Sequence, residues 1–121
     1  MGYESKLIII NRETHNLSNG KEFTFVDKIA EFNLSCVPWE NKDELFNIPV
    51  TFKFPVEGEN HYVKEDKYGE ICCMAKPSEV IAELRKMAKG EYYRRYYPVI
   101  ALLLAFDEKD WFDLRVIHYG Y

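Results

Sequence analysis

The sequence lacks the short motifs that mark a metal centre, a phosphate-binding loop or a catalytic thiol. It contains no GxGxxG or GxxxxGK(S/T) pattern, and its three histidines and three cysteines show no HxxxH or CxxC spacing. A metal site would therefore have to be assembled by the fold from distant residues. The sequence predicts no cofactor, no metal and no catalytic residue, and it favours a protein without enzymatic activity.

An excess of positive charge is also missing. The chain has 16 Lys and Arg residues against 20 Asp and Glu residues, which gives a formal net charge of −4. Nucleic acids and anionic membranes are bound through a basic surplus that releases counterions, so the net charge argues against a broad surface for either, although it leaves room for a local basic patch. The same charge is small for a protein that mimics nucleic acid, and we rank that reading third.

Cysteine is scarce, and long apolar runs are absent. Cys36 stands alone, and the adjacent Cys72 and Cys73 would point to opposite sides of a strand, so we predict three free thiols and a cytoplasmic protein. The first residues lack the pattern of a signal peptide, and Lys6 departs from the myristoylation pattern. The longest apolar run, Val99–Phe106, is far shorter than the roughly 20 residues that cross a bilayer.

What is present fits one folded domain over residues 1–121. The run Lys6–Ile10 is rich in β-branched residues and predicts a buried strand, and Asn19-Gly20 predicts a tight turn after it. Across Phe23–Val37 two alternating registers compete. We predict a strand with a bulge near Asp27, and a helix is the alternative.

The middle of the chain is predicted to form an irregular connection followed by a meander of antiparallel strands. The segment Trp39–Asn47 is charged, and we expect a solvated connection with one aromatic side chain tucked beneath it. Alternating apolar residues then predict three antiparallel strands separated by turns at Gly58 and at residues 66–69, namely Val50–Phe54, His61–Glu65 and Glu70–Ala75.

Two helices are predicted in the second half. Pro77–Lys89 carries an apolar stripe at helical spacing, with acidic residues near its start and basic residues near its end. The apolar run Val99–Phe106 predicts a buried helix that Pro98 either kinks or starts. Three of its side chains are expected to be fully buried: Leu102, Leu103 and Phe106.

These elements define an α+β fold: a mostly antiparallel sheet with two helices of the C-terminal half packed on one face, and a final C-terminal strand, Trp111–Tyr121, inserted in the sheet. Alternation in that strand places His118 on the helix side, at the rim of the core, with Phe112, Leu114 and Val116. Tyr119 and Tyr121 then lie on the other face.

The strongest candidate for a binding surface is the run Tyr92–Tyr97. Six large amphipathic side chains in succession cannot all face a core, and Tyr and Arg dominate binding hot spots. We expect Arg94, Arg95 and His118 to share one surface neighbourhood. The full predicted binding set is Tyr92, Tyr93, Arg94, Arg95, Tyr96, His118 and Tyr119. The structural alternative is that the tyrosines frame the sheet and the arginines pair with nearby carboxylates.

Two other groups of residues have weaker claims. A thiol of Cys72 or Cys73 could act as a nucleophile with His118 as its base, but no sharp glycine-rich turn marks a catalytic cysteine, and packing is the favoured role. Four carboxylates gather around a predicted hairpin, where a solvated edge is the favoured role: Glu57, Glu59, Glu65 and Asp66.

Three short pieces of the sequence carry a family resemblance. The start Met1-Gly2-Tyr3-Glu4-Ser5-Lys6, the triplet Tyr93-Arg94-Arg95 and the end His118-Tyr119-Gly120-Tyr121 resemble a family of small proteins carried by phages and prophages of Gram-positive bacteria. The resemblance covers the whole length, and residues 11–20 depart from its pattern. It implies a phage accessory protein in the bacterial cytoplasm that binds and inactivates a host protein, such as a CRISPR nuclease or another defence enzyme.

Two hypotheses follow. The preferred one is a non-enzymatic inhibitor that binds a host protein through the Tyr-Arg face and an acidic edge. The alternative is a pocket protein that sequesters or turns over a small phosphorylated or nucleotide ligand with Arg94, Arg95 and His118. No membrane and no direct nucleic-acid ligand is expected, and a homodimer stays open.

Overall fold

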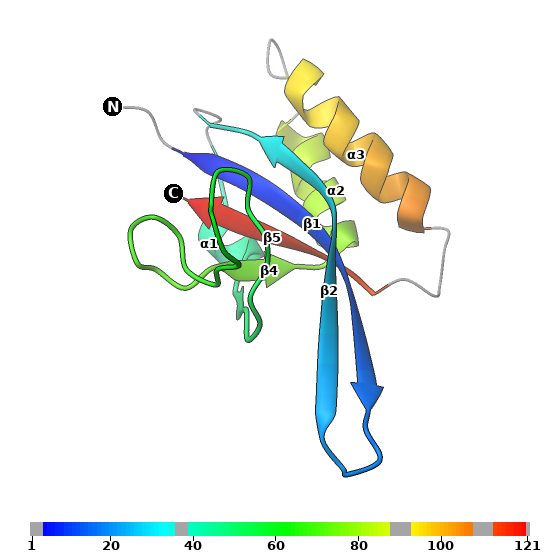
Figure 1. Cartoon of the computed structure of the whole chain (residues 1–121). Coiled ribbons are helices and arrows are strands. Elements are labelled where there is room, and N and C mark those ends of the chain that lie inside the picture. Colours follow the sequence, from blue (N-terminus) through cyan, green and yellow to red (C-terminus); the bar gives the residue numbers. More distant parts are fainter. Residues whose placement is uncertain (1–3, 36–38, 88–92, 108–112, 121) are drawn as a thin grey trace.

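The computed structural model describes residues 4–35, 39–87, 93–107 and 113–120. Within these residues the chain forms a five-stranded sheet and three helices (Figure 1). The strands are β1 (Ser5–Asn16), β2 (Glu22–Asn33), β3 (Ile48–Pro49), β4 (Cys73–Ala75) and β5 (Leu114–Gly120). The helices are α1 (Lys42–Leu45), α2 (Pro77–Met87) and α3 (Tyr93–Asp107). The predicted α+β class is confirmed.

The sheet has the strand order β2-β1-β5-β4-β3, and every neighbouring pair is antiparallel. β5 therefore lies between β1 and β4, which confirms the prediction that the C-terminal strand is inserted in the sheet. Its register sets Ile117 opposite Ile8 and Val116 opposite Ile9. The two ends of the chain thus form the centre of the fold.

The β1–β2 hairpin is longer than the sequence suggested. Its turn is closed by a hydrogen bond from the Leu17 amide to the Lys21 carbonyl, and Gly20 supplies the positive φ of 82° that the turn needs. Between Ile9 and Ile10 the register shifts, because Ile9 pairs with Ala30 whereas Ile10 pairs with Lys28. The bulge predicted near Asp27 is confirmed, and the helical alternative for this window is wrong.

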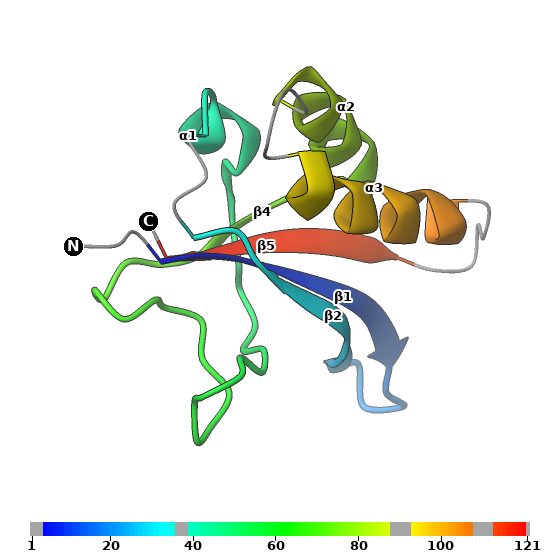
Figure 2. The same ribbon diagram turned by 90° about the horizontal axis from the view of Figure 1, so that it is seen from above.

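Both faces of the sheet are covered, which explains why β1 is apolar without alternation. Leu7 and Ile9 point to the side of α2 and α3, where they join one core cluster. Ile8 and Ile10 point to the other side and join a second cluster. Figure 2 shows the helices on one face and the chain between β3 and β4 crossing the opposite face.

The segment that crosses this second face does not form the predicted meander. Regular strands over Val50–Phe54 and His61–Glu65 are wrong: only isolated bridges join Phe54 to Val63 and Glu65 to Ile71. The predicted strand Glu70–Ala75 shrinks to β4. The reason is that this segment covers the sheet instead of extending it, with three buried side chains in the second cluster: Val50, Phe54 and Val56.

The predicted solvated connection Trp39–Asn47 is also a covering element. It contains the short helix α1, and its Phe46 is buried in the helix-side core cluster. The expected tucked aromatic is Trp39, whose ring meets that of Phe46 edge to face at 5.7 Å between centroids. This segment lies over the C-terminal end of β5.

Helix α2 matches its prediction and buries one apolar stripe: Val80, Ile81, Leu84 and Met87. Helix α3 begins before Pro98 and runs through it, so the prediction that the helix could start there is wrong. Residues 88–90 and the predicted strand start at Trp111 lie outside the described residues.

The apolar run in α3 is only partly buried. Leu103 is fully buried, whereas Leu102 and Phe106 are only half-buried and Leu104 is 39 % exposed. The expectation that all three predicted residues are fully buried is therefore wrong for two of them. One side of the helix packs on the sheet and on α2, and the other side faces outward.

We predict that Leu103→Ala lowers the free energy of unfolding by about 3 kcal/mol, because it leaves a cavity in the helix-side core. Leu104→Ala is the matched control on the same helix and should cost about 0.5 kcal/mol or less. Urea unfolding measures both. Equal losses would mean that the rotation of α3 about its axis is wrong.

Candidate functional site

The predicted Tyr-Arg face is divided between surface and interior. Arg94 is exposed and Tyr97 is 56 % exposed, whereas Tyr96 is buried. Arg95 is half-buried, and its guanidinium donates hydrogen bonds of 2.8 Å to the carbonyl oxygens of Ser35 and Asn33. Tyr92 and the side chain of Tyr93 lie outside the described residues.

Arg95 therefore ties α3 to the end of β2. Two donors of one guanidinium on two backbone carbonyls satisfy acceptors that the sheet leaves unpaired. The Ser35 hydroxyl in turn accepts a hydrogen bond of 3.3 Å from the Ser5 amide. These hydrogen bonds connect Arg95 to the start of β1, near His118. The connection runs through the protein, so Arg95 and His118 are not joined across an exposed surface.

The two C-terminal members of the predicted set are buried on opposite sides of the sheet. His118 lies on the helix side, as predicted, where Trp39 and Phe46 cover it and leave it 6 % exposed. Tyr119 lies on the other face, also as predicted, and its hydroxyl donates to Glu59 Oε1 at 3.1 Å. Burial and Glu59 raise the pKa of Tyr119. Binding by the complete set stays a prediction.

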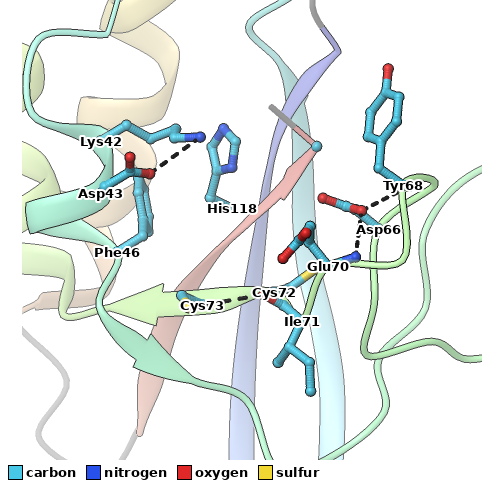
Figure 3. Close-up of a pocket in the computed structure, with 11 residues that line it drawn as sticks. Lys42, Asp43, Phe46, Asp66, Tyr68, Glu70, Ile71, Cys72, Cys73 and His118 are labelled. Carbon is cyan, nitrogen blue, oxygen red and sulfur yellow. Dashed lines mark hydrogen bonds and ion pairs between the residues drawn. The ribbon is translucent and has the colours of Figure 1, made fainter.

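A pocket of about 410 Å³ opens beside His118 (Figure 3). Lys42, Asp43 and Phe46 of the α1 segment form one wall, and residues 66–71 form the wall across from it. Cys73 of β4 and His118 of β5 lie between these walls, and the two residues are direct cross-strand partners. Three separate segments of the chain, residues 42–46, 66–73 and 118–120, thus meet at this site.

His118 is held by a hydrogen-bonded chain. Trp39 Nε1 donates to Ser5 Oγ at 3.0 Å, and Ser5 Oγ lies 2.8 Å from His118 Nε2. Since an indole nitrogen can only donate, Ser5 Oγ is an acceptor from Trp39, and its own proton has no other described acceptor than Nε2. The arrangement favours a ring proton on Nδ1, because a Ser5 hydroxyl that accepted from both Trp39 and Nε2 would leave its own proton without a described acceptor.

The charge state of the ring agrees with that assignment. Burial, with a contribution from the nearby Lys42 ammonium, lowers the pKa of His118 to about 3 against a smaller opposing effect of Asp43. The imidazole is therefore neutral throughout the physiological range. It can donate through Nδ1 but is a poor proton acceptor.

Cysteine chemistry is not favoured here. Burial raises the pKa of Cys73, and Asp43 adds to that effect, while burial raises the pKa of Cys72 to about 12. A neutral thiol beside a weakly basic imidazole lacks the thiolate that attacks a substrate. Cys72 and Cys73 are free thiols, as predicted, and Cys36 lies outside the described residues.

We predict that His118 makes the protein acid-sensitive. Its pKa is about 3 in the folded chain against an ordinary value of 6.5, so the unfolded chain binds the extra proton between these values. Stability is then fully present above pH 6.5 and falls as the pH drops toward 3, by up to about 1.4 kcal/mol per pH unit. His118→Gln should flatten this slope in pH-dependent urea unfolding, whereas the exposed control His61→Gln should keep it.

The sequence reasoning missed a second feature, the outer half of the β1–β2 hairpin. Within the described residues, β1 pairs with β5 as far as Asn11, and one further backbone hydrogen bond joins the Arg12 amide to the Asp113 carbonyl. Val26 packs against the second core cluster, so residues 13–25 form a two-stranded arm that projects from the body (Figure 1). Phe23 is 47 % and Phe25 55 % exposed on this arm. The signal was the two phenylalanines at alternating positions beyond the Asn19-Gly20 turn.

Comparisons of the chain with protein-family models, with curated proteins and with solved structures found no match. In the parts of the chain that the structure describes, no group of three or more His, Cys, Asp and Glu residues is arranged to hold a metal ion. No helix in those same parts is long and apolar enough to cross a membrane. The arm and the pocket are therefore the features that bear on the function.

Proposed function

We propose that the protein is a non-enzymatic binding protein that docks onto a partner protein through the arm formed by residues 13–25. The observation that supports this most strongly is the aromatic face of the arm. Phe23 and Phe25 meet edge to face at 4.6 Å between centroids, and His15 meets Phe25 at 6.0 Å. A two-stranded ribbon is marginally stable alone, so these exposed rings are better explained by a partner that covers them.

The face of the arm is a better docking surface than its edge. β2 is the outer strand of the sheet, and within the described residues no strand pairs with its free side. Its middle carries the bulge and the adjacent charges Asp27 and Lys28, two devices that discourage strand addition. The contact is therefore expected through side chains.

The surroundings of the rings indicate what kind of partner fits. Glu13 lies directly opposite Phe25, and Asp27 follows Phe25 on the same side of β2. Both carboxylates flank the aromatic face, so the complementary surface is an apolar pocket with a basic rim. We therefore assign the acidic part of the docking surface to Glu13 and to the neighbouring Asp27, and not to the carboxylates of residues 57–66 that the sequence suggested.

The finer form of this proposal comes from the sequence resemblance. A phage accessory protein that inhibits a host defence protein, such as a CRISPR nuclease, needs an exposed patch and no catalytic residue. The arm supplies such a patch. The identity of the partner and its inhibition rest on the resemblance alone.

The alternative, a protein for small phosphorylated ligands, has less support. It required Arg94, Arg95 and His118 to converge, but the guanidinium of Arg95 is engaged with two carbonyls and neither arginine lines the pocket of His118. That pocket contains one lysine and three carboxylates, which disfavours a phosphate.

The test is capture followed by binding of the purified partner. The immobilised protein is incubated with a Gram-positive host lysate, the captured protein is purified, and its affinity is measured by titration. We expect saturable binding that Phe23→Ser with Phe25→Ser abolishes. Sedimentation of the free protein tests the competing occupant, because a dimer lost in the same variant would assign the arm to a second copy. Capture that survives the double change would refute the proposal.

A further inference from the structure

The pocket beside His118 has an unused hydrogen-bond donor. His118 is only 6 % exposed, and Nε2 is engaged by Ser5, which leaves Nδ1 without a partner among the described residues. Among those residues, Glu83 Oε1 is the only fully buried side-chain nitrogen or oxygen that lacks a partner. Since Nδ1 also lacks a partner, it cannot be fully buried and keeps contact with solvent. The His118 ring lines the pocket. His118 is thus a buried side chain with one ring nitrogen open to solvent, and its hydrogen bond with Ser5 favours a proton on that nitrogen.

A second donor lies beside it. The side chain of Lys42 extends toward the His118 ring (Figure 3). Its one ion pair is with Asp43 Oδ1 at 3.5 Å, and the Asp43 side chain is 95 % exposed, so this pair is weak. The ammonium of Lys42 and the neutral Nδ1–H of His118 together form a pair of donors with one positive charge, which suits a carboxylate.

The opposite wall carries acceptors. Asp66 Oδ1 accepts hydrogen bonds from the amides of Tyr68 and Glu70, at 2.8 and 3.1 Å, which fixes the carboxylate and leaves Oδ2 available. The carboxylate of Glu70 lies on the same wall. Two negative groups there suit an ammonium group.

The total charge of the lining decides between ligand classes. One lysine and three carboxylates, Asp43, Asp66 and Glu70, line the pocket. A simple anion would be repelled by that excess, and a simple cation would leave the two donors unpaired. Apolar atoms of Phe46 and Ile71 complete the walls. A cavity of about 410 Å³ holds a molecule of amino-acid size.

We propose that this pocket binds a free α-amino acid as its zwitterion, with the carboxylate on Lys42 and His118 Nδ1 and the ammonium on the wall of Asp66 and Glu70. This site is separate from the arm. Its occupancy neither requires nor tests the docking function.

The experiment uses the intact chain labelled with ¹⁵N. Long-range ¹H–¹⁵N spectra first report the His118 tautomer, expected to carry its proton on Nδ1. The common L-amino acids are then titrated to millimolar concentration while the His118 ring is followed. We expect at least one to give a saturable shift. Its N-acetyl and its amide derivatives, which each lack one charge, should each bind about tenfold more weakly or worse.

Variants locate the site. Lys42→Met and Glu70→Gln should each weaken binding about tenfold. The controls Lys53→Met and Glu79→Gln remove exposed charges outside the pocket and should leave it unchanged, with thermal unfolding as the check on folding. The proposal is overturned by a proton on Nε2, by the absence of a saturable shift with every amino acid, by a derivative that binds as tightly as its parent amino acid, or by control variants that weaken binding as much as the pocket variants do.

Discussion

Replacing Gly120 with alanine is expected to lower the free energy of unfolding by about 4 kcal/mol. Gly120 adopts a φ of 108°, where an L side chain is strained, and a Cβ there would overlap the backbone carbonyl of Glu4. The carbonyl cannot move aside easily, because Gly120 pairs with Ser5 at the junction of β1 and β5. Strain and overlap each contribute about 1–3 kcal/mol.

Gly69→Ala is the matched control. Gly69 also has a positive φ, 81°, but a Cβ there would meet open space, so only the backbone strain of about 1 kcal/mol is expected. Urea unfolding of both variants isolates the effect of the collision. Equal losses would contradict the close approach of the two chain ends.

The largest effect on binding is expected on the arm. Phe23→Ser with Phe25→Ser should weaken the affinity for the purified partner at least about 100-fold, because two aromatic anchors of an interface contribute about 3 kcal/mol or more together. The free energy of unfolding should change little. Both rings are about half exposed and lie outside the two core clusters.

Two controls separate the arm from the rest of the surface. Tyr62→Ser removes an equally exposed aromatic ring on the opposite covering segment, and Arg94→Glu reverses an exposed charge of the predicted Tyr-Arg face. Arg94 is the suitable position because Arg95 supports the fold. If Arg94→Glu abolishes binding and the double phenylalanine change does not, the face predicted from the sequence is the functional one.

The centre of the fold could be predicted because its signals are local. A continuous β-branched run gave the doubly covered strand β1, two competing registers gave the bulge, and the stripe in Pro77–Met87 gave α2. The chain between β3 and β4 could not be predicted. Its alternating apolar residues resemble strands, but the fold uses them to cover the second face of the sheet, which is a long-range choice.

The sites were harder, because each depends on such long-range contacts. Nothing near Ser5 in the sequence indicates that it joins Trp39 to His118, and Arg95 resembles a binding residue until its two carbonyl partners are known. The sequence does show the two phenylalanines of the arm, Phe23 and Phe25, at alternating positions. Only the end of pairing between β1 and β5 at Asn11 shows that these rings lie beyond the core.

Site-specific photo-crosslinking in cells of a Gram-positive bacterium, the host that the sequence resemblance implies, tests the docking proposal most directly. The photoreactive residue p-benzoylphenylalanine is placed at Phe25, and in a control at Tyr62, which is similarly exposed. If the arm is the docking surface, position 25 gives one discrete crosslinked partner and position 62 gives none. No adduct from position 25, or the same adducts from both positions, would contradict it.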